Sequence, residues 1–364
     1  MHGAVRADLA RSRIAGPGAG DPRRETVVLE RLEALASGRG HDDLAERLGR
    51  IARWLCGDLG QVEAVLAATA DGTGHVRDVV HHLLDLGGKR LRPMCVALAA
   101  RAGSGFGPAA LELAVAVELV HTATLMHDDV VDLGDTRRGA PAARHVFGNA
   151  ASIFAGDWLL VEALRRIRFA GLPGLLERML EVVEEMIVAE TRQLEGRGRF
   201  NASLDDYLSI VRGKTAALFR WAMAAGGRAG WLGKTECAAL EEFGSHVGIA
   251  FQVVDDVLDL AGDPSVTGKA LFADLREGKM THPMIVAASR APELTSLLGR
   301  AIAGDPSAAA QALDRVACTH AVEESMAFAR REAQAAVECL QVLPAGLARQ
   351  SLECVADAAI VRRA

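Results

Sequence analysis

The chain has 364 residues, of which 50% are hydrophobic and only 4% are aromatic. This length is enough to bury a large core, and the single tyrosine and scarce strand-type alternation argue against a β-rich fold. The formal net charge of -6 lacks the basic footprint that is typical of nucleic-acid-binding proteins, so we expect no nucleic-acid partner.

The cysteines and the N-terminus bear on the compartment. No CxxC or other metal-type spacing joins the cysteines, which favours small buried hydrophobic residues in a reducing compartment. The N-terminus lacks the apolar stretch of about 7 to 15 residues that a secretory signal needs. No run reaches the roughly 20 uninterrupted apolar residues of a membrane span. We therefore expect a cytoplasmic protein without a transmembrane segment, which contacts membranes only peripherally.

In chain order, residues 1–25 are rich in Gly, Arg, Ala and Pro and lack periodicity, so we expect a disordered N-terminal extension. From residue 26 to residue 364, apolar residues recur at helical spacing and predict one domain of about ten or more helices. Turn-forming stretches separate these helices at 70–75, 86–93, 103–108, 137–141, 171–174 and 262–269. The segment 111–129 is apolar on nearly every side, which is typical of a helix inside a bundle.

The end of this apolar segment carries the sequence HDDVVD at residues 127–132. On a helix, Asp128 and Asp132 are one turn apart and project from the same face, with Asp129 next to them. Like charges at this spacing destabilise a helix, so a cation is expected to balance them. Carboxylate oxygens together with substrate phosphates are typical ligands of Mg²⁺, and the alternating ligand pattern of a calcium-binding EF-hand is absent.

The sequence FQVVDDVLDL at residues 251–260 repeats the arrangement. Asp255 and Asp259 share a helix face, and Asp256 is adjacent. One such cluster alone is equally consistent with a helix cap or a solvated face. Two matching clusters, each preceded by apolar residues, favour a metal site.

Several short stretches place glycine beside a cation or a hydroxyl. These stretches contain Lys89, Arg90 and Arg92 (GGKRLRP), Arg137 and Arg138 (RRG), Lys214 and Thr215 (GKT), and Lys269 and Lys279 (GK). Glycine lets a ligand approach the backbone, and arginine and lysine bind phosphate. GKT is not part of a nucleotide-binding P-loop, because Leu208 occupies the place of its first glycine. Singly, each cation is also consistent with a solvated surface; together with the aspartates they predict a site for two polyphosphate groups.

The order of these motifs resembles the trans-isoprenyl diphosphate synthases over roughly residues 45–362. The stretches that carry the resemblance are GGKRLRP, HTATLMHDDVVD, DTRRGAPA, FGNAASIFAGDWLL, GKTAALF, FQVVDDVLDL and DLREGKMTHP. Among these enzymes the sequence is most similar to the bacterial octaprenyl-type, long-chain polyprenyl synthases. The resemblance implies an all-α bundle around a deep central cavity, the isoprenoid synthase fold, and a homodimer. It also implies Mg²⁺-dependent condensation of isopentenyl diphosphate with an allylic diphosphate to an all-trans polyprenyl diphosphate.

The resemblance further implies a role for each motif residue. Three Mg²⁺ ions per substrate-loaded site would be held by Asp128, Asp132 and Asp255, whose shells would be completed or oriented by Asp129, Asp256 and Asp259. The allylic substrate would contact Arg137, Lys214, Thr215, Gln252, Lys269 and Lys279. Isopentenyl diphosphate would contact Lys89, Arg92, His121 and Arg138.

Product length is expected to depend on the helix face below Asp128. Thr124 is one turn earlier on that face, Ala123 lies beside it, and Val120 continues the descent. None of these residues is bulky, and the aromatic plug and two-residue insertion of short-chain synthases are missing. The expected products are therefore longer than farnesyl, from geranylgeranyl to octaprenyl or longer.

Two alternatives stay open from the sequence. A non-catalytic partner subunit of a heteromeric prenyl synthase would keep the fold but usually loses an aspartate motif or the cations. A class I terpene cyclase also uses an aspartate-rich motif with Mg²⁺, but would need neither GGKRLRP nor a second full motif. The chain departs from the family pattern at His282, where leucine is common.

Overall fold

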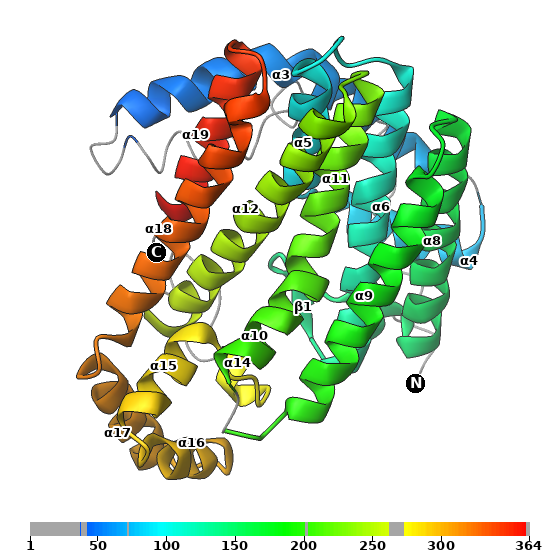
Figure 1. Cartoon of the computed structure of the whole chain (residues 1–364). Coiled ribbons are helices and arrows are strands. Elements are labelled where there is room, and N and C mark those ends of the chain that lie inside the picture. The colour runs from blue at the N-terminus through cyan, green and yellow to red at the C-terminus, as the bar shows by residue number, and fades with distance from the viewer. Residues whose placement is uncertain (1–36, 38–41, 71–72, 201–202, 262–272, 362–364) are drawn as a thin grey trace.

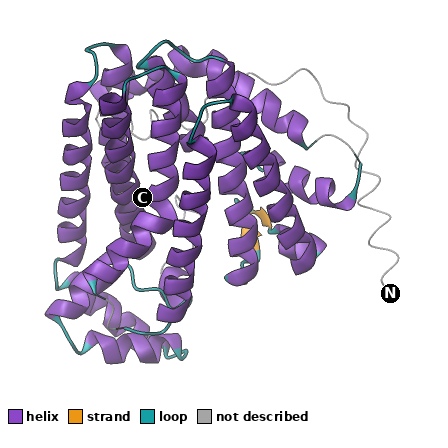
Figure 2. Cartoon of the chain, turned by 45° about the vertical axis from the view of Figure 1, so that its right-hand side comes forward, coloured by secondary structure: helices purple, strands orange, loops and turns teal. Residues whose placement is uncertain are grey.

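The structure is a computed structural model that describes residues 37, 42–70, 73–200, 203–261 and 273–361. Within these ranges the regular structure is helical except for one short hairpin of two-residue strands (Figure 2). The predicted all-α fold of ten or more helices is therefore confirmed. The predicted N-terminal extension, residues 1–25, lies outside the described residues.

The first half of the chain forms the upper and right-hand parts of Figure 1. Its elements are α3 (Asp42–Thr69), α4 (His75–Asp85), α5 (Leu91–Arg101), α6 (Pro108–Val131), β1 (Thr136–Arg137), β2 (Ala140–Pro141), α7 (Ala143–Phe147), α8 (Asn149–Ala170) and α9 (Leu175–Gly196). The strands β1 and β2 pair antiparallel, with Arg137 opposite Ala140. The predicted turn-forming stretches of this half, at 70–75, 86–93, 103–108, 137–141 and 171–174, all fall between helices or at a helix end.

The second half of the chain begins with a helix that changes type near its middle. Its elements are α10 (Leu204–Val211), the π-helix η2 (Arg212–Ala216), α11 (Ala217–Ala229), α12 (Lys234–Ala261), α14 (Ala273–Arg276), α15 (His282–Arg290), α16 (Leu294–Ile302), α17 (Pro306–Ala317), α18 (Ala321–Cys339), the 3₁₀-helix η3 (Leu340–Val342) and α19 (Leu347–Val361). Single turns of π-helix are frequent at functional sites, because they redirect side chains within a helix.

The helix α6 corresponds to the predicted apolar segment and runs through the bundle. It packs against α5, α8 and α11, and lies between α11 and α8 in Figure 1. It is the one helix of the described residues that is long and apolar enough to cross a membrane, and 67% of its most apolar stretch is buried by the rest of the protein. Burial on nearly every side by neighbouring helices explains why its sequence shows no polar face.

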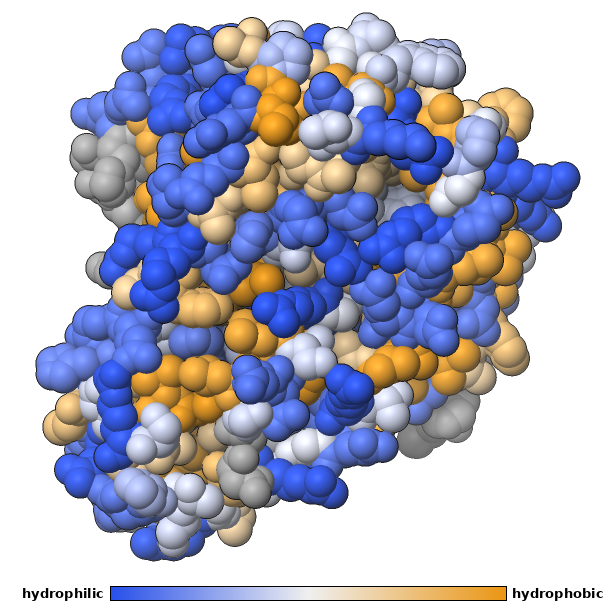
Figure 3. Space-filling model, viewed as in Figure 1, coloured by the Kyte–Doolittle hydropathy of each residue, from blue (hydrophilic) through white to orange (hydrophobic). Residues whose placement is uncertain are grey.

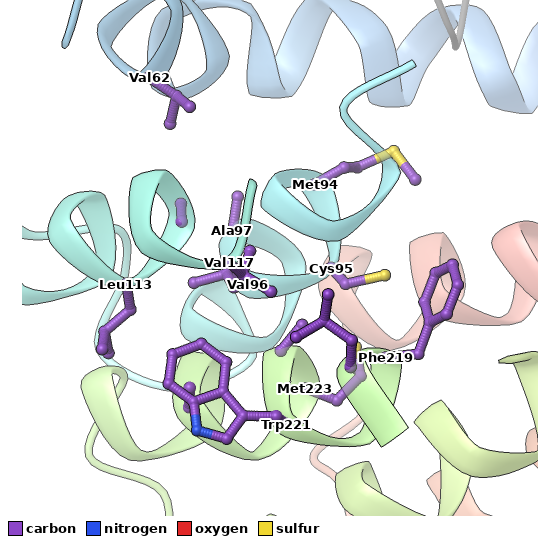
Figure 4. Packing of buried hydrophobic residues seen from close by; sticks show 14 of the residues in the cluster. Val62, Met94, Cys95, Val96, Ala97, Leu113, Val117, Phe219, Trp221 and Met223 are labelled. Atoms are coloured by element: carbon purple, nitrogen blue, oxygen red, sulfur yellow. The ribbon is translucent and has the colours of Figure 1, made fainter. Parts of the chain in front are cut away.

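The main hydrophobic core lies among α5, α6 and α11. Figure 4 shows its centre, where Trp221 and Met223 of α11 lie with Val96 of α5 and Val117 of α6. The indole nitrogen of Trp221 donates a hydrogen bond to the Leu175 carbonyl at 3.2 Å, so this buried polar group is satisfied. The core thereby fixes the relative positions of the helices that carry the cationic and acidic motifs.

A second, smaller core joins α14, α15, α16 and α17 at the lower left of Figure 1. Leu294 and Leu298 of α16 are fully buried there, and each contributes about 2 kcal/mol of transfer free energy. Phe200, after α9, and Met280, before α15, also pack against this core. Two loops that are far apart in the sequence are thus anchored on one cluster.

Candidate active site

The first aspartate motif lies where α6 ends. Asp128 and Asp132 are partly exposed, whereas Asp129 is only 2% exposed. The backbone N–H of Asp132 donates to the Asp128 carbonyl at 2.8 Å, so helical geometry continues through the motif. Helical spacing therefore turns the second aspartate into the protein and leaves the other two on one outer face.

The two outer carboxylates of this motif differ in charge environment. Burial raises the pKa of Asp128 to about 6, although the Lys214 ammonium opposes the shift. Burial also acts to raise the pKa of Asp132, but the hydrogen bond and charge of Lys279 and the charge of Arg197 outweigh it, so that this pKa is lowered. At neutral pH both groups are carboxylates, and Asp132 is the more firmly ionised.

Asp129 is held by the hairpin that follows α6. The Arg137 guanidinium on β1 donates to its carboxylate through Nε, at 3.0 Å from Oδ1, and through Nη2. The Gly134 backbone N–H donates to the Asp129 carbonyl at 2.9 Å. Arg137, which was predicted to contact the allylic substrate, therefore also neutralises a buried carboxylate and ties the hairpin to the end of α6.

The second aspartate motif lies near the end of α12. Asp256 is 3% exposed and accepts three hydrogen bonds: from Tyr207 Oη at 2.6 Å, from Gln252 Nε2 at 2.9 Å and from the His282 backbone N–H at 3.1 Å. Burial raises its pKa to about 7, and the Asp274 carboxylate adds to the shift. All three donors are neutral, and within the described part of the chain no cationic side chain pairs with this carboxylate.

The other two aspartates of the second motif are partly exposed and one turn apart on α12. Asp259 Oδ2 accepts a hydrogen bond from the Asp274 backbone N–H at 3.3 Å, which ties α12 to α14. The Asp255 carboxylate is close enough to Arg92 of α5 to raise the pKa of that guanidinium, against the stronger effect of burial. As at α6, the first and last aspartates of the motif face outward together.

The π-helix η2 links the two motifs. Thr215 Oγ1 donates to Gln252 Oε1 at 2.8 Å, and the amide group of the same Gln252 donates to Asp256. These two bonds fix which way the Gln252 amide points. The preceding residue, Lys214, exerts its charge on the Asp128 carboxylate of the first motif. Two adjacent residues of η2 therefore act on different motifs, so both motifs lie close to η2.

Lys214 is itself held by α9. Its ammonium lies 2.6 Å from Glu190 Oε1 and 2.9 Å from Gln193 Oε1. The sequence did not lead us to assign either Glu190 or Gln193 to the site. Their spacing of three residues on one helix face, beside a GKT motif, is the signal that identifies them.

A cluster of cationic side chains lies where α5 begins. The Arg92 guanidinium lies 4.7 Å from the ring centroid of Phe219, a cation–π arrangement. Its Nε atom is buried and has no hydrogen-bond partner among the described residues. A buried donor without a partner costs free energy, so this atom is suited to receive an oxygen of a ligand. Lys89 is exposed in the loop that leads into α5.

His121 of α6 faces the same cations. Burial lowers its pKa well below the usual range, and the guanidinium groups of Arg92 and Arg138 lower it further. The imidazole is therefore neutral at physiological pH, with one nitrogen able to donate and the other able to accept. It can bind an anion without adding to the local positive charge.

Arg90 organises this cluster; it was counted among the cations expected to bind phosphate, but the resemblance assigned it to neither substrate. Its side chain is 10% exposed and forms ion pairs with Glu63 of α3 and with Glu118 of α6, the latter at 2.7 Å. A Cβ atom at Gly88 would lie 2.7 Å from Arg90 Nη1 and 3.1 Å from Arg138 Nη2. Glycine at this position thus leaves room for two guanidinium groups to converge.

Asp132 is the meeting point of two further cations. Lys279 Nζ donates to its Oδ2 at 2.9 Å, and Arg197 Nη2 donates to its Oδ1. Lys279 was predicted to lie near the allylic diphosphate, whereas Arg197 was not assigned. The stretch GRGR at 196–199 places glycine beside arginine, which is the signal used for the other cations. Lys269 falls outside the described residues.

The residues expected to govern product length line α6 before Asp128. Val120 and Ala123 are buried, and Thr124 is partly exposed and donates from Oγ1 to the His121 carbonyl at 2.8 Å. This bond turns the hydroxyl of Thr124 back onto its own helix. His127 contacts α8, with Nε2 3.3 Å from the Ile153 carbonyl oxygen, so it is directed away from the aspartates that follow it.

The donor set fits a hard divalent cation that is bound together with its substrate. Among the described residues, no group of three acidic, histidine or cysteine side chains converges closely enough to hold an ion alone. The partly exposed carboxylates instead form pairs at the ends of α6 and α12. Mg²⁺ is characteristically bound by one or two carboxylates, water and substrate phosphates rather than by a complete protein cage.

The chain is similar to proteins of known class over most of its length. A family profile described as Polyprenyl synthetase matches residues 73–318. The octaprenyl diphosphate synthase of Escherichia coli (strain K12) is 34% identical over 290 residues, which cover 79% of this chain and 90% of that protein. Component 2 of the heptaprenyl diphosphate synthase of Geobacillus stearothermophilus is 33% identical over 304 residues, which cover 83% and 95%.

A solved structure extends the likeness to three dimensions. The crystal structure of a polyprenyl synthase from Caulobacter crescentus CB15, complexed with calcium and isoprenyl diphosphate, matches with a TM-score of 0.82 and 33% sequence identity. The match covers 87% of this chain and 98% of that one. The helices and loops that carry the site thus lie within a shared architecture.

Proposed function

Because the chain belongs to the polyprenyl synthetase family, we propose that it condenses isopentenyl diphosphate with an allylic diphosphate to form an all-trans polyprenyl diphosphate. It is a prenyltransferase. The observation that carries the proposal is the link through η2: Lys214 acts on the first aspartate motif while Thr215 is bonded to the helix of the second. A terpene cyclase would need only one diphosphate site.

The allylic substrate is proposed to bind between the two aspartate motifs. Asp128, Asp132 and Asp255 would hold Mg²⁺, and Lys214 and Lys279 would contact the diphosphate. Bound Mg²⁺ supplies positive charge to the departing diphosphate oxygens. The reaction then breaks the allylic C–O bond, and the developing anion is stabilised by lysines already fixed by carboxylates and an amide.

Isopentenyl diphosphate is proposed to bind at the cationic cluster where α5 begins. The Arg92 Nε donor, the Arg138 guanidinium and neutral His121 would face its diphosphate, with Lys89 at the entrance. The double bond of this substrate attacks the allylic cation, a new C–C bond forms, and a proton is lost. The departed diphosphate is the proposed proton acceptor. It is an anion released beside the new C–C bond, so the reaction does not require a side chain as the base.

The growing chain is proposed to extend along α6 below Asp128. Thr124 is small, and its hydroxyl is already bonded to its own helix, so an apolar chain meets no free polar group there. Relatives of this chain are named for different products, octaprenyl and heptaprenyl, and therefore do not fix the length. Products longer than farnesyl, from geranylgeranyl to octaprenyl or longer, are proposed.

The function is tested by product sizing. The purified protein is incubated with Mg²⁺, labelled isopentenyl diphosphate and each of a series of allylic primers, and the dephosphorylated products are separated by length. The expected result is Mg²⁺-dependent elongation beyond farnesyl. A folded preparation that elongates no primer would refute catalysis by this chain alone. Products of three isoprene units or fewer would refute only the proposed space below Thr124.

A homodimer is proposed to form through α8 and α9. Large apolar side chains are exposed along both helices, and orange patches mark this side of the molecule in Figure 3, at the right. The side chains are Phe154, Val161, Phe169, Leu180, Ile187, Val188 and Leu194. Leu180, Ile187 and Leu194 recur every seventh residue, which is the spacing of a helix-packing seam.

The proposed dimer is tested by light scattering on the purified chain, with Ile187→Lys as the disrupting variant. We expect the wild type to have twice the mass of one chain in solution, and the variant to have the mass of a single chain. A wild-type monomer without activity would instead favour a heteromeric enzyme, of the kind in which the heptaprenyl relative is one component.

We further propose a cytoplasmic location, with peripheral membrane contact for release of the apolar product.

A further inference from the structure

Two loops from distant parts of the chain are joined beside Asp132. The Gly198 backbone N–H, after α9, donates to the Gly278 carbonyl, before α15, at 2.9 Å. Both glycines have left-handed φ angles, of 73° and 76°. A Cβ at Gly278 would lie 2.9 Å from the Gly198 nitrogen, so the two backbones touch where only glycine fits. We call the two joined loops, residues 197–200 and 277–280, the platform.

Each loop is also anchored by an apolar side chain. Phe200 of the first loop and Met280 of the second pack against the same core as α16. Phe200 Cε2 would lie 3.7 Å from a Cβ at Gly299 of that helix, which is ordinary van der Waals contact. The positions of the residues next to the two glycines are therefore set by packing as well as by the backbone bond.

The platform delivers one cation to each oxygen of Asp132. Arg197 Nη2 donates to Oδ1, and Lys279 Nζ donates to Oδ2 at 2.9 Å. All three side chains are shielded from solvent to a large degree, with 26% of Arg197, 12% of Lys279 and 20% of Asp132 exposed. A carboxylate that is proposed to bind Mg²⁺ is thus already saturated by two protein cations.

The two cations are not equivalent. Lys279 Nζ also lies 2.6 Å from Glu277 Oε2, so it keeps a negative partner if Asp132 turns to a metal. Among the described residues, Asp132 is the acidic partner of Arg197, and no second one is found. The Arg197 Nε atom is in addition buried without a hydrogen-bond partner in the described part of the chain. Arg197 therefore donates a hydrogen bond through Nη2, while its Nε donor has no acceptor in the described part of the chain.

We propose that Arg197 is an exchangeable counter-ion: it neutralises Asp132 before metal binding, and when a divalent cation takes that carboxylate, Arg197 moves to the diphosphate of the allylic substrate. This inference rests on the proposed function. A divalent cation and a guanidinium compete for Asp132 Oδ1. The guanidinium is displaced, because its single charge attracts the carboxylate less strongly than the double charge of the metal ion does. The diphosphate that arrives with the metal offers oxygens in the geometry that an arginine fork binds with two parallel bonds. No charge is left without a partner in either state.

The proposal predicts two effects of opposite sign in Arg197→Met. In calorimetric titrations at low ionic strength, Mg²⁺ alone should bind about five- to tenfold more tightly than to wild type, because one competing cation has gone. Inorganic pyrophosphate in saturating Mg²⁺ should bind about five- to tenfold more weakly, because one fork has gone. Arg197→Lys keeps the charge and should return the affinity for Mg²⁺ alone close to that of wild type.

Arg199→Met is the matched control, since Arg199 lies in the same loop, is exposed and carries the same charge. It should leave both affinities within about twofold of wild type, because an exposed charge is screened by solvent. Equal effects of the two variants would attribute the change to general loop charge and overturn the assignment to Arg197. Unchanged or weaker binding of Mg²⁺ alone in Arg197→Met would overturn the counter-ion role, and unchanged pyrophosphate affinity would overturn the transfer to diphosphate.

The outcome is separable from that of the proposed function. The titrations read the exchange at Asp132 directly and need no turnover. If the wild type elongates primers while Arg197→Met shows no gain in Mg²⁺ affinity, the counter-ion proposal fails and the function stands. If the wild type elongates no primer but the opposite shifts are observed, the exchange stands and the assigned reaction fails.

Discussion

The two aspartate motifs share one spacing but lie in different electrostatic surroundings. In both, the second aspartate is buried, with Asp129 2% exposed and Asp256 3% exposed. Asp129 is held by the cationic fork of Arg137, whereas Asp256 is held by Tyr207 and other neutral donors. Helical geometry therefore decides which aspartates turn inward, and residues distant in the sequence decide how their charge is met.

This difference assigns separate tasks to the members of each motif. The inward aspartates connect the motif to its support: the hairpin after α6 in one case, and α10 and α15 in the other. The outward members, such as Asp128 and Asp255, are partly exposed to solvent. Two motifs with the same aspartate spacing can thus be stabilised differently, one by an ion pair and the other by a hydrogen-bond network.

The largest effect is expected from truncating the outward aspartates. Asp128→Ala and Asp255→Ala should each lower kcat by about 10²- to 10³-fold, since each removes a group aimed at developing charge. The helical circular dichroism should be unchanged, and Asp205→Ala, on the exposed first turn of α10, is the control for loss of a helix carboxylate. Activity within about twofold of wild type in either site variant would remove that residue from the proposed metal site.

Removing a hydrogen-bonding partner should lower the free energy of unfolding by different amounts at the two inward aspartates. Arg137→Met leaves a buried carboxylate unpaired and should lower the free energy of unfolding by about 3 kcal/mol. Tyr207→Phe removes one of three neutral donors to Asp256 and should cost about 1.5 kcal/mol. Urea unfolding of metal-free protein measures both. Equal costs would contradict the distinction between an ion pair and a neutral network, and Asp129→Asn with Arg137→Met should recover part of the first loss.

The neutral network also predicts a pH dependence. The pKa of Asp256 is raised to about 7 in the folded protein, above the value of about 4 for an unfolded chain. The folded state therefore binds more protons between these values, and stability falls as pH rises through this window. Between about pH 5 and about pH 8 the metal-free wild type should lose about 2 to 3 kcal/mol through this group.

Asp256→Asn removes the titrating group and tests this pH dependence. Its urea midpoint, measured in the presence of a chelator, should show a flatter decline from acid to alkaline pH than that of the wild type. The comparison is made between the slopes, so that the contributions of the other carboxyl groups cancel. Parallel slopes in the two proteins would show that Asp256 is ionised over the whole range.

The smallest effect on the rate is expected from changes one helical turn before each motif. The residue at this position is Thr124 on α6 and Phe251 on α12. Thr124→Phe should shorten the products to about three isoprene units or fewer while the first condensation keeps a rate within about tenfold, because a ring replaces a small side chain below Asp128. Phe251 instead packs against Phe219, with ring centroids 5.8 Å apart. Phe251→Ala should therefore leave product length unchanged; longer products from it would place the channel along α12.

Much of the fold could be predicted from the sequence because it depends on local pattern. Helical periodicity predicts an all-α protein, turn-forming stretches predict where helices end, and the apolar segment 111–129 predicts a buried helix that the structure places at Pro108–Val131. The spacing of the aspartates likewise predicts which pairs share a face. These properties are set by residues within one or two turns of each other.

The partners of the site residues could not be predicted in the same way. Tyr207 and His282 meet Asp256 across 49 and 26 positions in the sequence, and no local pattern encodes such a contact. The π-helix η2, which turns Lys214 and Thr215 to opposite motifs, has no simple signature. Arg197 is an exception, because the glycine-beside-cation rule applied to 196–199 would have identified it.

The most direct test is a crystal structure of the protein with Mn²⁺ in place of Mg²⁺ and an allylic thiodiphosphate that resists ionisation. Anomalous scattering then locates each ion. We expect ions bound by Asp128, Asp132 and Asp255, with the diphosphate between α6 and α12, and with Asp129 and Asp256 still hydrogen-bonded inside the protein. Ions confined to one motif, or bound by either inward aspartate, would contradict this expectation.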